Sequence, residues 1–201
     1  MLILKLFIQG LYFKMVVNAL THKGANIENC LRTPVKIANP SNAQTIESLG
    51  IWDTGATNSV ITKAVARNLG LKPVQYAKVR GVHGEKTVPV YFVSITLNNE
   101  NITLKTLVSE CEELSDNNDT GMLIGMNIIN TGDFCITNFD NKTVLTFRTP
   151  SLTKIDYVEE IAEHKKYLKV YQIQHQHGND RCPCGSNKLY KNCHGRSIYN
   201  K

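Results

Sequence analysis

Residues 49–57 read Leu-Gly-Ile-Trp-Asp-Thr-Gly-Ala-Thr, an apolar run that ends in Asp53 with Gly55 two positions later. The run predicts a buried strand whose end delivers a carboxylate to a tight turn. Glycine is expected there because it adopts backbone angles that are closed to other residues. The hydroxyl of Thr54 and the backbone amides after Asp53 can donate hydrogen bonds in this turn. The stretch therefore predicts a carboxylate positioned by backbone, although an ordinary Asx-turn between a strand and a helix remains an alternative.

Residues 123–127, Leu-Ile-Gly-Met-Asn, form a second stretch that begins 70 positions after Asp53. Alone it would indicate an ordinary core strand that ends where a helix starts. In this order after Asp-Thr-Gly-Ala, and with Ser-Val-Ile at 59–61, it resembles the retropepsin-like aspartic proteases, the single-lobe relatives of pepsin. In that family the two bulky residues pass under the catalytic loop, and the glycine allows close backbone approach.

The resemblance implies catalytic roles for Asp53, Thr54 and Gly55. Two carboxylates about 3 Å apart share one proton, because both cannot ionise together. The chain holds one Asp-Thr-Gly, so the second copy would come from another subunit about a two-fold axis, and an obligate homodimer is expected. Thr57 replaces the acidic residue that viral members usually carry, so their supporting salt bridge is not expected here.

Residues 79–85, Val-Arg-Gly-Val-His-Gly-Glu, predict a Gly-rich hairpin tip before a long strand over 87–97. A change of apolar phase in that strand predicts burial on both faces. The resemblance implies a flap that closes over an extended peptide. The substrate-binding residues would be Ala56, Gly81, Val82, His83 and Gly84. His83 is interpreted as a solvated hairpin histidine rather than a catalytic group.

The remaining pattern predicts a mainly β, single-lobe acid-protease barrel over residues 33–149. It includes a helix over 60–69 stopped by Gly70, an exposed loop over 110–120 and a closing hairpin over 134–147. Residues 1–32 are set apart as an opening strand or a helix at the dimer surface. A signal peptide is disfavoured because residues 1–13 lack a charged leading region and a small-residue cleavage site, and Met15 is an alternative start.

Beyond the barrel, residues 150–180 predict a linker helix and a polar hinge. His175 and His177 could bind metal, but no partner lies nearby in sequence, and a hinge is favoured. Residues 181–197 carry Cys182, Cys184, Cys193 and His194 in the spacing C-x-C-x8-C-H. Three thiols and an imidazole suit a structural zinc, one per chain, which would stabilise so small a tail by about 10 kcal/mol.

The spacing resembles the SEC-C motif, the zinc-binding tail of the bacterial preprotein translocase ATPase and of unrelated bacterial proteins. A disulfide is the alternative, but Cys182 and Cys184 are too close for an easy bridge. The other cysteines, Cys30, Cys111 and Cys135, are scattered and are expected to be buried or semi-buried thiols in a reducing cytoplasm.

The positive charge is concentrated in the tail. Residues 181–201 hold five Lys and Arg and no acid, which is +5 of the formal +6. An acidic protein, a ribosome or other RNA, or anionic lipid could bind there. No apolar span of 18 residues occurs, so no membrane span is expected.

Together these patterns predict a cytoplasmic, homodimeric aspartic endopeptidase targeted by its zinc tail. Two alternatives stay open: a non-catalytic peptide-binding module on the same fold, and a zinc-dependent adaptor for which the barrel is only a dimeriser.

Overall fold

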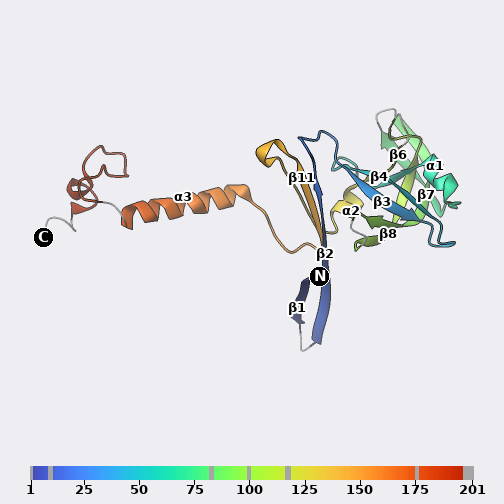
Figure 1. The fold of residues 1–201 in the computed structure, drawn as a ribbon, viewed down its shortest axis with the longest axis horizontal. Coiled ribbons are helices and arrows are strands. Elements are labelled where there is room, and N and C mark those ends of the chain that lie inside the picture. Colours follow the sequence, from blue (N-terminus) through green and yellow to red (C-terminus); the bar gives the residue numbers. More distant parts are fainter. Residues whose placement is uncertain are drawn as a thin grey trace. The chain divides into compact units, whose positions relative to one another are not determined.

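The structure is a computed structural model that describes residues 2–8, 11–81, 84–98, 101–115, 119–174 and 177–196. The chain divides into two compact units, Met1–Thr153 and Lys154–Lys201. The first unit is built almost entirely from strands, and the second holds one long helix and a small cysteine-rich loop (Figure 1).

The first unit is built around a seven-stranded sheet in the order β3-β4-β9-β5-β8-β7-β6. Because β3 also pairs with β7, six of these strands close into a barrel, and β6 continues beyond it. The strands are β3 (Arg32–Ala38), β4 (Thr45–Trp52), β5 (Val60–Thr62), β6 (Gln75–Gly81), β7 (Gly84–Leu97), β8 (Thr103–Cys111) and β9 (Thr120–Ile124). The prediction of a mainly β, barrel-like fold is confirmed.

The barrel core follows the two-residue period of its strands. In the second half of β7, Tyr91, Val93, Ile95 and Leu97 are buried, whereas Phe92 is 42% exposed. The prediction that this strand is buried on both faces is therefore wrong for most of its length, since one face of a closed barrel points outward. The first half of β7 leaves the barrel and pairs with β6 instead.

A second sheet has the order β1-β2-β11-β10, formed by β1 (Leu2–Ile8), β2 (Leu11–Lys23), β10 (Asp133–Thr137) and β11 (Val144–Thr149). The closing hairpin is confirmed, with a short 3-10 helix (Phe139–Asn141) between β10 and β11. The N-terminal segment forms an antiparallel hairpin of β1 and β2 rather than a helix. The segment expected to stand apart is joined to the rest, because β2 pairs with β11 along six residues.

Helix α1 (Lys63–Asn68) is shorter than the predicted helix, because residues 60–62 form β5 between β8 and β9. The hydroxyl of Thr62 accepts a hydrogen bond from Val65 N at 3.3 Å and caps the helix. Gly70, at a φ of +59°, follows its end as expected. A short helix α2 (Met126–Ile129) follows β9. The predicted loop is also shorter, since β8 extends to Cys111 and β9 begins at Thr120.

The second unit contains one long helix, α3 (Tyr157–Gln174), within the segment 150–180 for which a helix and a hinge were predicted. Residues 157–166 of this helix are all exposed. After it, the chain forms a bridge between Arg181 and Leu189 and a 3-10 turn (Tyr190–Asn192). Within the described residues, no helix is long and apolar enough to cross a membrane.

Candidate functional site

Asp53 lies directly after β4, half-buried, in a loop held by backbone hydrogen bonds. Its amide donates to the carbonyl of Ile124 at 3.0 Å, and its Oδ1 accepts from the amide of Gly55 at 2.8 Å. The backbone therefore fixes the direction of the carboxylate, as the sequence predicts. The reason given for Gly55 needs correction, because its φ is not positive. A Cβ at this position would instead lie 3.2 Å from the Asp53 carboxylate.

The stretch 123–127 lies behind this loop. Strand β9 pairs in parallel with β4, with Ile124 opposite Trp52. A Cβ on Gly125 would lie 2.6 Å from the carbonyl carbon of Asn58 and 2.9 Å from the Ala56 oxygen. The close approach expected of this glycine is thus present. The amide of Met126 also donates to the Ala56 carbonyl at 2.8 Å.

A neutral side-chain network, which the sequence analysis missed, joins the loop to α2. The buried Ser59 donates from its hydroxyl to Asn127 Oδ1 at 2.7 Å and accepts from the amide of Gly125 at 2.9 Å. The amide of Ser59 donates to the same Asn127 oxygen at 2.8 Å. The backbone amide of Asn127 also donates to the carbonyl of Thr57. Thr57 is the residue that stands where viral members usually carry an acid. The signal in the sequence was a serine and an asparagine beside otherwise apolar stretches.

The predicted Gly-rich hairpin is formed by β6 and β7, whose antiparallel register runs to Gly81 opposite Gly84. Val82 and His83 lie outside the described residues. Gly84 has a φ of +99°, a conformation that favours glycine. Arg80 and Glu85 form an exposed ion pair at 2.8 Å. Among the described residues, no hydrogen bond joins this hairpin to residues 53–56.

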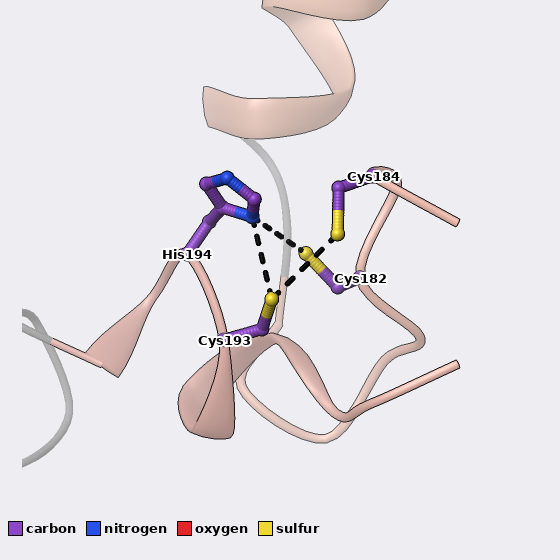
Figure 2. A group of neighbouring side chains, drawn as sticks. All are labelled: Cys182, Cys184, Cys193 and His194. Atoms are coloured by element: carbon purple, nitrogen blue, oxygen red, sulfur yellow. Dashed lines mark hydrogen bonds between the residues drawn. The ribbon is translucent and has the colours of Figure 1, made fainter. Parts of the chain in front are cut away.

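The four predicted metal ligands converge in the second unit (Figure 2). Their ligand atoms all lie within 4.8 Å of one another. Nδ1 of His194 is 3.3 Å from Sγ of Cys182 and 3.4 Å from Sγ of Cys193, which is 3.6 Å from Sγ of Cys184. A tetrahedron with metal–sulfur bonds of about 2.3 Å and a metal–nitrogen bond of about 2.1 Å has edges close to these lengths. The donor set therefore fits a zinc ion.

The surroundings of the thiols favour ionisation at two positions. Burial opposes the charge on Cys182, but backbone amides of Cys184 and His194 donate to it and lower its pKa to about 7. The hydroxyl and amide of Ser186 lower the pKa of Cys184. Ser186 also favours the Cys193 thiolate, but burial and the two neighbouring thiols raise the pKa of Cys193 overall. A metal that binds thiolates would stabilise all three in the charged form.

Two other sequence features remain outside the cluster. His175 lies outside the described residues. His177 donates from its backbone amide to Asp180 at 2.9 Å, and it is absent from the group of converging ligands found in the described part of the chain.

The three cysteines outside the cluster differ in burial. Cys111 and Cys135 are half-buried, but Cys30 is exposed, which corrects the expectation of burial. Burial and the neighbouring Glu110 and Glu112 raise the pKa of Cys111 to about 11.

Two segments of the chain match models of known protein families. Residues 42–131 match the family model described as gag-polyprotein putative aspartyl protease, and residues 179–196 match the model of the SEC-C motif. The first of these segments is therefore similar to the retropepsin-like aspartic proteases, and the second is similar to the SEC-C motif. No curated protein matches it.

Several solved structures are similar to part of this chain. A retropepsin-like aspartic protease from Rickettsia conorii has 15% identity and a TM-score of 0.41, over 68% of this chain and 98% of that one. The EIAV protease in complex with the inhibitor HBY-793 has 24% identity and a TM-score of 0.37, over 52% and 88%. The foamy viral protease-reverse transcriptase has 22% identity and a TM-score of 0.37, over 50% of this chain and only 11% of that one.

Proposed function

We propose that this protein is an aspartic endopeptidase of the retropepsin type that is active as a homodimer. The observation that carries the proposal is the placement of Asp53. Its carboxylate is oriented by the Gly55 amide, in a loop supported from behind by Gly125. A single carboxylate so placed is half of an acid–base pair, and a second copy of the chain would supply the other half.

In the proposed reaction, one Asp53 is protonated and its mate is ionised. The ionised carboxylate takes a proton from a water molecule, which attacks the scissile carbonyl, and the protonated one stabilises the developing oxyanion. The carbon–nitrogen bond then breaks as a carboxyl proton passes to the leaving nitrogen. Because the nucleophile is water, no covalent intermediate with the enzyme forms. Thr54 would bond across the two-fold axis between the two loops, and Gly55 would keep space beside the carboxylate.

Substrate binding is assigned to the loop and the flap. Ala56, together with residues 81–84, would contact an extended peptide that lies as a strand between them. The flap would exclude water while the dyad acts. Gly81 and Gly84 lie on either side of the hairpin tip. The hairpin lies outside the closed barrel and most of its described side chains are exposed, so it would move without disturbing the barrel core.

The direct test is cleavage of a peptide library by the wild-type protein and by Asp53→Asn. The substitution keeps the shape and removes the shared charge, so cleavage should fall by at least about a thousandfold. Asp140→Asn, an exposed position in the turn between β10 and β11, is the matched control and should cleave like wild type. Equal cleavage by wild type and Asp53→Asn would refute the proposal.

We assign a structural zinc to Cys182, Cys184, Cys193 and His194. The ion would supply the binding energy that holds the two ends of this loop together, since four protein ligands leave no open position. It takes no part in peptide hydrolysis. Groups of the chain itself favour thiolates at this site. The Ser186 hydroxyl lies 3.1 Å from Sγ of Cys184 and 3.4 Å from Sγ of Cys193, and backbone amides of Cys184 and His194 donate to Cys182.

A targeting role is proposed for the same unit, in the cytoplasm. Arg181, Lys188 and Arg196 are exposed around the cysteine loop, and no acidic residue lies in residues 181–196. An acidic protein surface, a ribosome or other RNA is the expected class of partner.

This exposed charge also favours the second candidate function, a zinc-dependent adaptor for which the barrel is only a dimeriser. Salt-sensitive partner binding that survives Asp53→Asn and is lost with Cys182→Ser, in a chain that cleaves nothing, would support it.

A further inference from the structure

Helix α3 carries an apolar stripe on an otherwise charged surface. Within the helix, Tyr157, Val158 and Ile161 are 57%, 80% and 55% exposed. Positions i, i+1 and i+4 lie on one side of a helix, so these three side chains form one stripe. Helices in proteins gain most of their stability by packing an apolar face against another element, so a partner is expected for the stripe on this 18-residue helix.

The stripe fits the heptad pattern of a coiled coil. With Tyr157 at position d, Ile161 falls at a and His164 at d, and the sequence continues the same spacing with Leu168 and Tyr171. In this frame Glu160 takes position g and Lys165 takes position e. Both are exposed, and neither forms an ion pair within the described residues.

These two charges specify an orientation. In a parallel pair of helices, a g residue of one helix lies beside the e residue five positions later in its partner. Glu160 of one copy would therefore meet Lys165 of the other, and the two-fold axis would create this pair twice. Another exposed acid of this helix, Glu163, falls at position c and faces away from such a seam.

We infer that α3 forms a short parallel coiled coil with α3 of a second copy of this chain, held in register by Glu160–Lys165 pairs. The inference rests on the proposed function for its two-fold axis, because the Asp53 site also needs a second copy. Two isolated helices would associate only weakly through a seam of little more than two heptads that has a histidine at one core position. Tethering to a barrel that also dimerises raises the effective concentration of the helices and makes a weak seam sufficient.

The test measures dimer dissociation of the full-length, zinc-loaded chain by sedimentation at low salt, with Asp53→Asn in every variant to prevent self-cleavage. Glu160→Lys places like charges together at both symmetric contacts and should raise the dissociation constant about tenfold. Lys165→Glu should do the same. The double exchange, Glu160→Lys with Lys165→Glu, restores opposite charges and should recover the wild-type constant.

Glu163→Lys is the matched control, since it makes the same change in net charge on the same helix and should leave the constant unchanged. Circular dichroism checks that α3 still forms in each variant. Equal effects of Glu160→Lys and Glu163→Lys, no effect of either, or no recovery in the double exchange would overturn the inference. Cleavage by the chain with its native Asp53, assayed separately, tests the proposed function independently of this outcome.

Discussion

At the scale of single residues, Asp133 at the start of β10 holds the end of the first unit together. Its carboxylate accepts hydrogen bonds from the side chain of Arg148, the hydroxyl of Ser151 and the amide of Leu152. The Leu152 amide, the Ser151 hydroxyl and Arg148 all favour the charged form and hold the pKa of Asp133 well below its usual value of 3.8. The segment that leaves β11 is thereby fixed against the second sheet.

This geometry predicts an acid-sensitive contribution to stability. Because the pKa of Asp133 is lower in the folded chain than in the unfolded one, its carboxylate stabilises the fold above about pH 4, and that contribution is lost as the pH falls further. Asp133→Asn should be less stable than wild type by about 1–2 kcal/mol at neutral pH. The difference should shrink in acid, as measured by urea unfolding across the pH range. A difference that is constant with pH would contradict this explanation.

The residue scale also shows what the sequence could reveal about the site. Asp53 and Gly125 were predictable, because a carboxylate in a tight turn and a glycine between bulky residues each have few structural explanations. Asn127 was not, because its importance lies in hydrogen bonds to Ser59, 68 positions away in sequence. A polar side chain gives no indication of its partner until the fold places the two together.

At the scale of elements, the β6–β7 hairpin is the part of the first unit whose disturbance should affect function more than stability. Gly84 has a φ of +99°, which a β-branched residue does not readily adopt. Gly84→Val should lower kcat/KM for peptide cleavage roughly tenfold. The distorted hairpin tip would lose about 1–2 kcal/mol of its stabilisation of the transition state. The midpoint of thermal unfolding should barely change, because the hairpin lies outside the barrel.

Thr87→Val is the control on the same hairpin, an exposed strand position where a β-branched residue is favoured. It should cleave peptides as wild type does. If the two variants lose activity equally, the conformation of Gly84 is not what matters, and the assignment of this hairpin as a flap loses its support.

Element boundaries were predicted less well than element types. The apolar spacing at 61, 64, 65 and 69 indicated one helix, yet residues 60–62 form β5, because β8 and β9 offer hydrogen-bond partners on both sides. Similarly, the pairing of β2 with β11 joins segments more than 120 residues apart. Local propensity cannot anticipate such long-range pairing.

At the scale of the whole molecule, the two units should respond independently to metal removal. A strong zinc chelator, or Cys182→Ser, should reduce bound zinc from about one ion per chain to near zero and unfold the cysteine loop. Thermal unfolding of Met1–Thr153 should be unchanged, because that unit has its own core. Cys30→Ser, at an exposed cysteine of the first unit, is the control, and a full zinc complement in Cys182→Ser would disprove the ligand assignment.

The proposed homodimer rests on a count rather than on a contact, since the chain has one Asp-Thr-Gly and the proposed chemistry needs two aspartates. Asp53 is half-buried in its loop, and the residues that would face its mate, Thr54 and Gly55, are exposed.

Mixing wild-type subunits with Asp53→Asn subunits tests this central claim most directly. The two proteins are combined at fixed total concentration, allowed to exchange subunits, and assayed for peptide cleavage as the fraction of wild type is varied. If each site needs one Asp53 from each chain, activity follows the square of that fraction, and an equal mixture retains about a quarter of the wild-type activity. A linear dependence, with about half of the activity in the equal mixture, would show that each chain acts alone and would contradict the account.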